Sequence, residues 1–277
     1  MTSVKLLSMT QNPIEVMWTA ARTCYSAKGP IEIWKWKYGE EEQVVKEYQE
    51  KMWKLVKTVL DSGHQSIAEH VYFTFAIEGI SRACSHQLVR HRAGIVFSQQ
   101  SQRYVEIKED INEVQNFRAF SASERENAIK MCSKYFVDVN ESNCSGYIES
   151  LWEYLNAINN GLKPEDARNF LPNATKTNII MSLNYRELIH ICNLRLCARA
   201  QDEIRTLFGI IRLAVNREDD KLASLLVPTC EVNGFCKEHK CCGRKPRLED
   251  IKIKPRQVFM SDDDEPSFLG RLNEHNM

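Results

Sequence analysis

HVYFTFAIEG, residues 70–79, alternates between large apolar side chains and a mixed set of residues. Val71, Phe73, Phe75 and Ile77 share one face of an extended chain, and the opposite face is only half polar. Successive side chains of a strand point to opposite faces, so this pattern predicts a well-buried strand.

Two further segments have the composition of strands. One covers residues 3–9, and the other covers residues 176–184, where Ile179, Met181 and Leu183 lie on one side. Helices are predicted from Pro13 onward, over 40–61, from Ser81 toward residue 92, over 122–160 with a break or two, within 163–175 up to Pro172, and over 185–217. The clearest is 40–61, which begins with acids, is closed by Gly63, and has one apolar stripe of Val45, Tyr48, Met52, Leu55 and Val59.

Composition divides the chain near residue 227. Residues 1–227 carry the predicted strands and helices, and residues 228–277 are richer in Pro, Gly, Lys and Cys. We interpret the second part as a Cys-rich, loop-like extension whose acidic SDDDE end is a disordered tip. The chain therefore consists of one main domain and this extension.

Charge and length exclude several classes of protein. The 277 residues hold 37 basic and 37 acidic side chains, whereas nucleic-acid-binding domains are usually basic. No apolar run approaches the roughly 18 residues that span a membrane, and the first residues have no signal-peptide core. Ten cysteines without a secretory signal indicate reduced thiols, and we expect a cytoplasmic protein.

A basic cluster occupies QLVRHRAGIVFSQQSQRY, residues 87–104. Arg90, His91 and Arg92 lie at the end of the helix predicted from Ser81 toward residue 92, where they can address different groups of one ligand. Arginine binds phosphate with two parallel hydrogen bonds, which suits a nucleotide or dinucleotide. Arg103 adds a further guanidinium. The alternative interpretation is a solvated basic turn with salt bridges.

Two other segments add polar groups. GHQSIAEH, residues 63–70, carries His64, Ser66, Glu69 and His70, although Ser66 and Glu69 are also spaced as a helix capping box. The helix predicted over 185–217 places a polar stripe on one face, namely Arg195, Arg199, Asp202 and Thr206. That stripe is also compatible with an exposed, salt-bridged face. On the same helix Gln201 shares the apolar face of Leu194 and Phe208, where a buried amide needs a partner.

Taken together, these segments resemble the flavin-dependent thymidylate synthase family, also called thymidylate synthase-complementing proteins. The family signature is Arg-His-Arg, a gap of seven residues, and then four residues: Ser, either Gly or Gln, Arg, and Tyr. Here it stands as Arg90-His91-Arg92 and Ser101-Gln102-Arg103-Tyr104. The resemblance extends in the same order through ARTCYS (21–26), GHQSIAEHVYFTF (63–75), ARNFLP (167–172) and NYRELIHICNLRLCARAQDEI (184–204).

The match has departures. Eight residues separate Arg92 from Ser101, and we place the additional residue within Ala93–Phe97. The backbone of this loop therefore differs from the family pattern. Cys24 stands where some members have Ser, and Gln99 where some have Glu.

The resemblance implies conversion of dUMP to dTMP. Methylenetetrahydrofolate would supply the carbon, reduced FAD the hydride, and NADPH would reduce the flavin. The chain has no GxGxxG or GxxxxGK[ST] loop, so arginine side chains are expected to bind the flavin diphosphate. The partners implied are these small molecules, without nucleic acid or membrane.

The resemblance also assigns residues. The FAD candidates are His64, Ser66, Arg90, His91, Arg92, Gln99, Asn184 and His190, and the dUMP candidates are Gln87, Ser101, Arg103, Tyr104, Arg168 and Arg195. Arg103 and Arg168 would face the phosphate. Arg195 and Ser101 are the catalytic candidates: Arg195 would stabilise negative charge on the uracil, and Ser101 would bind and polarise. No general base stands beside Ser101 in the sequence, which argues against a nucleophile.

The family implies an α+β fold, with an antiparallel sheet packed with long helices. It also implies a homotetramer whose active sites are shared between subunits. In the matched blocks, Cys24, Cys192 and Cys197 are expected to be core or flavin-lining thiols.

The extension carries a possible metal site that the resemblance does not assign. Thiolate and imidazole are preferred zinc ligands, and five such residues occur close together: Cys230, Cys236, His239, Cys241 and Cys242. No CxxC pair is present, and we therefore favour reduced thiols without metal.

Two other functions remain as alternatives. A flavin oxidoreductase on this scaffold could have lost methylation, but Arg103, Arg168 and Arg195 would then be idle. A nucleic-acid-binding module could use the basic cluster, but the net charge is zero and aromatics do not alternate with the cations.

Overall fold

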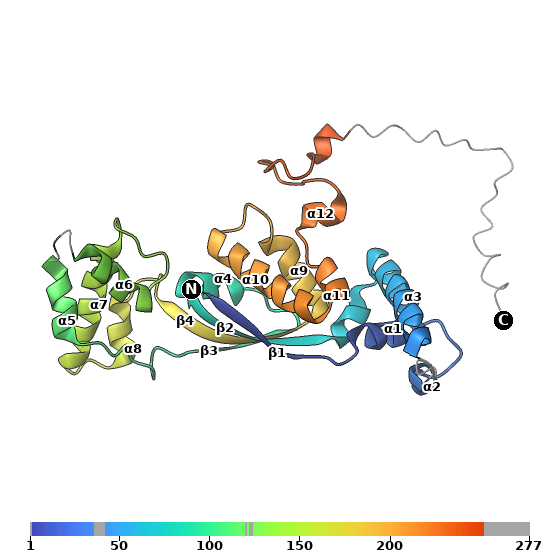
Figure 1. The fold of residues 1–277 in the computed structure, drawn as a ribbon, viewed down its shortest axis with the longest axis horizontal. Helices are drawn as coiled ribbons and strands as arrows, with labels where there is room; N and C mark the ends of the chain where they lie inside the picture. The colour runs from blue at the N-terminus through green and yellow to red at the C-terminus, as the bar shows by residue number, and fades with distance from the viewer. Residues whose placement is uncertain (1, 36–41, 120, 122–123, 252–277) are drawn as a thin grey trace.

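The computed structural model describes residues 2–35, 42–119, 121 and 124–251, and its centre is a four-stranded antiparallel sheet (Figure 1). The strands are β1 (Ser3–Met9), β2 (Tyr72–Ser81), β3 (Ile95–Gln99) and β4 (Lys176–Asn184), in the spatial order β1-β2-β4-β3. The strands predicted over 3–9, 70–79 and 176–184 are confirmed. β3 was not predicted, because its five residues lie in the segment interpreted as a ligand-binding loop.

The two faces of the sheet differ. Phe73, Phe75 and Met181 lie on the face covered by helices, and all three are completely buried. The covering helices are α4 (Arg82–Leu88), α9 (Tyr185–Arg195) and α10 (Asp202–Glu218), which lie above the sheet in Figure 1. On the other face large apolar side chains are exposed, namely Leu7, Tyr72, Val96 and Ile180. The burial predicted for residues 70–79 therefore holds for one face in this chain.

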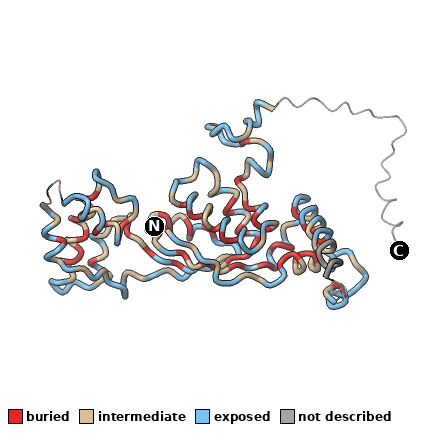
Figure 2. The backbone as a smooth tube through the Cα atoms, viewed as in Figure 1, coloured by how far each residue is buried: buried red, intermediate tan, exposed pale blue. Residues whose placement is uncertain are grey.

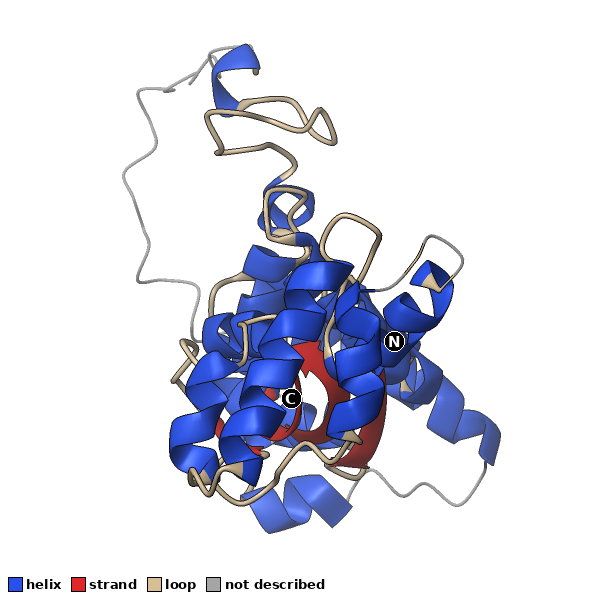
Figure 3. Ribbon diagram, turned by 90° about the vertical axis from the view of Figure 1, so that its left-hand side faces the viewer, coloured by secondary structure: helices blue, strands red, loops and turns tan. Residues whose placement is uncertain are grey.

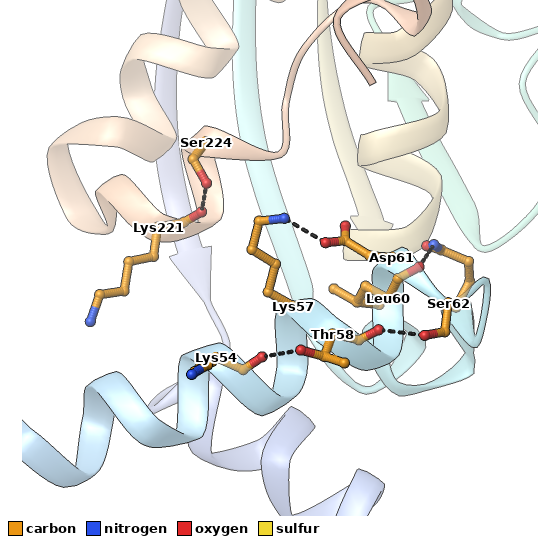
Figure 4. Close-up of polar contacts among 9 residues, drawn as sticks. Lys54, Lys57, Thr58, Leu60, Asp61, Ser62, Lys221 and Ser224 are labelled. Atoms are coloured by element: carbon orange, nitrogen blue, oxygen red, sulfur yellow. Dashed lines mark hydrogen bonds and ion pairs between the residues drawn. The ribbon is translucent and has the colours of Figure 1, made fainter. Parts of the chain in front are cut away.

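The N-terminal helices pack at one end of the sheet. They are α1 (Pro13–Thr23), α2 (Pro30–Lys35), α3 (Glu42–Asp61) and the 3₁₀-helix η1 (Gln65–His70). In α3, Met52, Val56 and Leu60 are buried at helical spacing, so the helix is amphipathic as predicted. Of the predicted stripe, Tyr48, Leu55 and Val59 are only half-buried, and the side chain of Val45 lies outside the described part. The end of α3 is shown in Figure 4, where Lys57 Nζ lies 2.5 Å from Asp61 Oδ2 and the Ser62 hydroxyl donates to the Thr58 carbonyl at 2.8 Å.

A helical lobe lies at the opposite end of the molecule (Figure 1). It comprises α5 (Ile111–Asn116), η2 (Phe117–Ala119), α6 (Arg125–Tyr135), α7 (Cys144–Asn159), α8 (Pro164–Ala167) and η3 (Arg168–Phe170). This lobe has its own hydrophobic cluster, including Val114, Ile148, Leu151 and Tyr154, and Figure 2 shows buried backbone both here and around the sheet. The expected break within 122–160 lies between α6 and α7.

The single helix predicted over 185–217 is wrong. The chain forms α9 up to Arg195, turns, and resumes as α10 at Asp202. Arg205 Nη1 donates to the Ala198 carbonyl at 2.8 Å and so satisfies an acceptor that the break releases. Tertiary contacts here outweigh the helix propensity of the turn sequence. The predicted polar stripe from Arg195 to Thr206 therefore does not exist as one helix face.

The C-terminal extension begins after α11 (Asp220–Ser224). It contains α12 (Thr229–Asn233), an isolated bridge between Cys236 and Arg247, and η4 (Leu248–Asp250). Figures 1 and 3 show that most of this segment projects from the body of the molecule. The predicted acidic tip lies outside the described residues, and the domain boundary stays a prediction. None of the helices in the described part of the chain has the length and apolarity of a membrane span.

Candidate active site

Helix α4 delivers the basic cluster to the surface. The Ser81 hydroxyl caps the helix by accepting the Cys84 N–H at 2.9 Å, as predicted for a serine at this position. The helix ends at Leu88, so the following residues leave it in different directions. Arg90 and Arg92 are exposed, whereas His91 is buried between them.

His91 lies at the centre of a polar group in which His91 and Glu187 are buried, Arg195 is half-buried and His190 is exposed. Arg195 Nε donates to His91 Nε2 at 3.2 Å, and Nδ1 of the same ring lies 3.7 Å from a carboxylate oxygen of Glu187. The His190 ring stands edge-on at 6.3 Å. Burial, and then the charges of Arg195 and His190, lower the pKa of His91 to about 4, so the imidazole is neutral at pH 7 and accepts from the guanidinium.

Asn184 connects this group to the loop after the basic cluster. Its side-chain oxygen caps α9 by accepting the Glu187 N–H at 2.9 Å, and its backbone N–H donates to the Gly94 carbonyl at 3.0 Å. Gly94 has φ of 63°, and a Cβ there would lie 2.1 Å from Asn184 Nδ2. Only glycine fits this turn. The departure predicted within Ala93–Phe97 thus falls on this turn and the start of β3.

A second group of arginines lies near the helical lobe. Arg103 Nε donates to the Glu165 carboxylate at 2.9 Å, and Arg168 Nε donates to the backbone carbonyl of the same residue at 2.9 Å. Burial, and then the charge of Arg168, lower the pKa of Arg82. Arg103 and Arg168 thus both contact Glu165, and Arg82 lies close enough to Arg168 for their charges to interact; we call these three the arginine group.

Sequence reasoning missed Arg82. A signal was available, because Arg82 opens helix α4, where the partial positive charge of the helix end makes a cation unfavourable. A cation placed against the helix dipole favours an anionic partner nearby.

The amino end of α10 holds α4 in place. Glu203 Oε1 accepts the Ser81 N–H at 2.6 Å, and Oε2 accepts the Ser81 hydroxyl at 2.5 Å. Gln87 Nε2 donates to Gln201 Oε1 at 2.7 Å. Gln201 is exposed, so its predicted position on a buried apolar face is wrong and follows from the wrong helix. Glu203 was not predicted.

The polar residues at the end of β3 and just after it have different hydrogen-bond partners. The Ser101 hydroxyl accepts the Arg103 N–H at 3.2 Å, and Ser101 lines a cavity of about 280 Å³. Tyr104 is 78% exposed, with the Arg103 guanidinium 5.3 Å from its ring centre. Gln99 Nε2 donates to the hydroxyls of Ser85 and Thr177, which ties β3 to α4 and β4.

The side chains of His64 and Ser66 form no hydrogen bond or ion pair with either group among the described residues. Both are exposed at η1, which is capped at His64 without a side-chain hydrogen bond, so the predicted capping box does not form. Glu69 instead pairs with Arg186 on α9. In the described part of the chain the structure therefore joins His91, Asn184, His190 and Arg195 in one group and Arg103 with Arg168 in another.

The thiols occupy varied surroundings. All ten cysteines are free; Cys24 is exposed, Cys197 is half-buried, and burial raises the pKa of Cys192 well above its usual value. Cys230, Cys236 and Cys242 line a cavity of about 550 Å³ that also includes Arg195. Within residues 2–251, apart from the short undescribed gaps, no three His, Cys, Asp or Glu side chains are grouped as metal ligands would be.

The chain is similar to known proteins of one family. The family model described as thymidylate synthase complementing protein matches residues 5–218. A flavin-dependent thymidylate synthase from Clostridium tetani is 36% identical over 258 residues, covering 90% of this chain and 96% of that protein. The protein of the same name from Geobacter sulfurreducens is 40% identical over 209 residues, covering 74% of this chain and 78% of that protein.

Solved structures show the same fold. A flavin-dependent thymidylate synthase from Helicobacter pylori, crystallised with FAD and dUMP, superposes with a TM-score of 0.62 at 24% identity and covers 81% of this chain and 99% of its own. A UMP/dUMP methylase from Streptomyces cacaoi, bound with 5-Br dUMP, superposes with a TM-score of 0.58 at 20% identity. The match covers 81% of this chain and 94% of the methylase. The predicted α+β class with an antiparallel sheet is confirmed.

Proposed function

The chain belongs to the thymidylate synthase complementing protein family, and from this premise we propose that it is an FAD-dependent thymidylate synthase. The net reaction takes dUMP, methylenetetrahydrofolate, NADPH and a proton to dTMP, tetrahydrofolate and NADP⁺. The observation that carries the proposal is the hydrogen bond from Arg195 to His91, because it joins a dUMP candidate to an FAD candidate.

The residues present fit FAD. Arg90 and Arg92 are exposed beside buried His91, and within the described part of the chain neither forms an ion pair or hydrogen bond. Their free guanidinium groups suit a diphosphate. Bound FAD supplies hydride chemistry that no side chain can provide. Asn184 and His190 belong to the same group as His91 and would contact the flavin. His64 and Ser66 would come from another part of the assembly.

The arginine group suits the phosphate of dUMP. Arg103 and Arg168 converge on Glu165, and Arg82 adds a third cation close to Arg168. A phosphate dianion would replace the Glu165 carboxylate as the partner of Arg103, because two charges bind a guanidinium more strongly than one. Gln87 and Tyr104 are further dUMP candidates on the neighbouring surface.

Arg195 would act on the uracil. The neutral His91 ring accepts its Nε–H and leaves the two terminal nitrogens of the guanidinium free to donate. A guanidinium held in this way stabilises negative charge on the pyrimidine as it accepts electrons. Ser101 would donate a hydrogen bond to the substrate, since no imidazole or carboxylate contacts its hydroxyl among the described residues.

We further propose a homotetramer whose active sites are shared between subunits. The exposed face of the sheet, with Leu7, Tyr72, Val96 and Ile180, offers an apolar surface for a second copy. A second subunit could also bring His64 and Ser66 close to His91 and His190. We expect the assembly in the cytoplasm, where its free thiols stay reduced, and without a nucleic-acid partner.

The test is anaerobic turnover with one component omitted at a time. We expect dTMP to form from dUMP only when FAD, NADPH and methylenetetrahydrofolate are all supplied. A purified protein that is colourless and takes up no FAD would contradict the proposal. Oxidation of NADPH without any dTMP would instead identify an oxidoreductase that has lost methylation.

A further inference from the structure

A cavity of about 550 Å³ lies between the end of α9 and the C-terminal extension. One wall comes from Asn193–Arg195 and the turn Cys197–Ala200. The other wall comes from Pro228–Cys230 and the segment between Cys236 and Arg244. We call this the C-terminal cavity. Its volume lies in the range of small-molecule sites, about 300–1,000 Å³.

The lining of the C-terminal cavity is strongly basic. Its cationic side chains are Arg195, Arg199, Lys237, Lys240 and Arg244, and Glu238 is the one acid among the described residues that line it. Glu238 Oε2 lies 3.4 Å from Arg199 Nε, so this carboxylate balances the charge of Arg199. Lys237, Lys240 and Arg244 are exposed, and none of the three forms an ion pair within the described residues. Uncompensated charge of one sign in a cleft attracts ligands of the opposite sign.

The extension is held over α9 by direct contacts. Arg199 Nη1 donates to the Lys240 carbonyl at 3.2 Å, and the Thr229 hydroxyl donates to the Asn193 carbonyl at 3.0 Å. These bonds attach two points of the extension, Thr229 and Lys240, to α9 and to the turn that follows it. The basic side chains are therefore held on the same side of the molecule as the proposed reaction centre.

The cavity also has an apolar part, provided by Leu194, Ala198 and Pro228. We propose that the C-terminal cavity binds an anionic organic co-substrate, with its apolar body beside α9 and its anionic groups on Lys237, Lys240 and Arg244. This inference rests on the proposed function, which requires two such molecules. The anions would be the carboxylates of a folate polyglutamate chain or the phosphates of a nicotinamide dinucleotide.

The test compares a triple variant, Lys237→Gln, Lys240→Gln and Arg244→Gln, with the wild-type holoenzyme. Lys54→Gln is the matched control, since Lys54 is exposed on α3 (Figure 4) and does not line the cavity. We expect the triple variant to raise the KM of one co-substrate roughly tenfold, because three exposed charge contacts each contribute up to about a factor of five. Lys54→Gln should leave it within twofold.

The two sources of anion give different results. If folate is the ligand, the rise will be larger for methylenetetrahydrofolate pentaglutamate than for the monoglutamate, and the KM of NADPH will not change. If the dinucleotide is the ligand, the KM of NADPH will rise and the preference between the two folates will stay as in the wild type.

The proposal is overturned if neither KM changes, or if only the KM of dUMP or the affinity for FAD changes. Melting temperature and FAD content will show whether the triple variant is folded. If it is not, the single variants Lys237→Gln and Lys240→Gln replace it, with a proportionately smaller rise expected. If the wild type makes no dTMP, the proposed function fails, and calorimetric binding of folate pentaglutamate and NADPH then tests the cavity directly.

Discussion

Arg195 donates its Nε–H to Nε2 of His91 across 104 residues of sequence, at 3.2 Å. The bond requires an imidazole that is neutral, and the low pKa of His91 keeps it so. Helix α9 supplies the guanidinium and the end of α4 supplies the ring, so the bond also fixes the relative position of two elements that carry candidate site residues.

Replacing Arg195 by alanine should abolish turnover while the protein stays folded. Loss of a preorganised donor to a developing charge typically lowers kcat by about 10²–10³. Steady-state dTMP formation measures the loss, and melting temperature with FAD content checks the fold. Arg186→Ala, exposed on the same helix and paired with Glu69, is the comparison. Turnover near wild type in Arg195→Ala would rule out the proposed role.

Stability should fall as the pH is lowered from 6.5 toward 4, in part because of His91. Its folded pKa of about 4 lies below the unfolded value near 6.5, so the unfolded chain binds the proton more readily. The contribution is complete above pH 6.5 and is lost as the pH falls toward 4, by at most about 3 kcal/mol. Glu187, Arg195 and His190 are the charged or ionisable residues that lie next to the ring.

The measurement for this pH effect is denaturant unfolding of wild type and His91→Gln between pH 4 and 8. Other carboxylates titrate in the same range, so the difference between the two proteins is the relevant quantity. The stability difference should be nearly constant above pH 7 and should change in favour of the variant below 6. Parallel pH profiles would mean that His91 is not held neutral by the fold.

Substituting Gly94 by alanine should destabilise the protein and weaken flavin binding. The new Cβ would lie 2.1 Å from Asn184 Nδ2, at a φ of 63° that alanine adopts poorly. The expected loss is about 2 kcal/mol or more, since backbone strain and a steric clash act together. Gly146→Ala in α7 is the control: no atom lies within 4 Å of its Cβ, and alanine in a helix should stabilise by up to about 1 kcal/mol. Equal melting temperatures for the two variants would contradict the assignment.

Glu203→Gln tests whether the amino end of α10 positions α4. The carboxylate accepts both the N–H and the hydroxyl of Ser81, and an amide has only one accepting oxygen for the two donors. We expect weaker FAD binding and a changed flavin absorption spectrum, with only a small loss in melting temperature. Glu218→Gln, exposed at the far end of the same helix, is the control. A variant that binds FAD as tightly as wild type would show that α4 is positioned without Glu203.

Local patterns predicted the parts of the fold that depend on burial. The alternation in β2 and β4 and the helical spacing in α3 reflect which side chains face the core, and this is written in the sequence itself. The break between α9 and α10 leaves no such pattern in the sequence, because its turn is made of good helix formers. It is accompanied by a local hydrogen bond from Arg205 to the Ala198 carbonyl and by the distant contact between Glu203 and Ser81.

The candidate site was predicted as a set of residues but not as an arrangement. Motifs identified His91, Asn184 and Arg195 individually, and their contacts depend on how α4 and α9 meet over the sheet. The position of β3 was hidden because five residues with polar ends are compatible with a loop as well as a strand. Arg82 lies outside the quoted motifs, and Glu203 lies within residues 184–204 but was not singled out. Arg82 opens helix α4, and Glu203 accepts hydrogen bonds from its cap, Ser81.

The wall that encloses the Arg195 end of α9 comes from a segment that lies outside the sheet and its covering helices. Its sequence is therefore free of the packing constraints that act on Phe73, Phe75 or Met181. A change in the length or charge of this segment would therefore leave the sheet and its covering helices intact. Selectivity can in this way diverge between species by alteration of the tail alone, and an inhibitor that contacts the tail would distinguish one species from another.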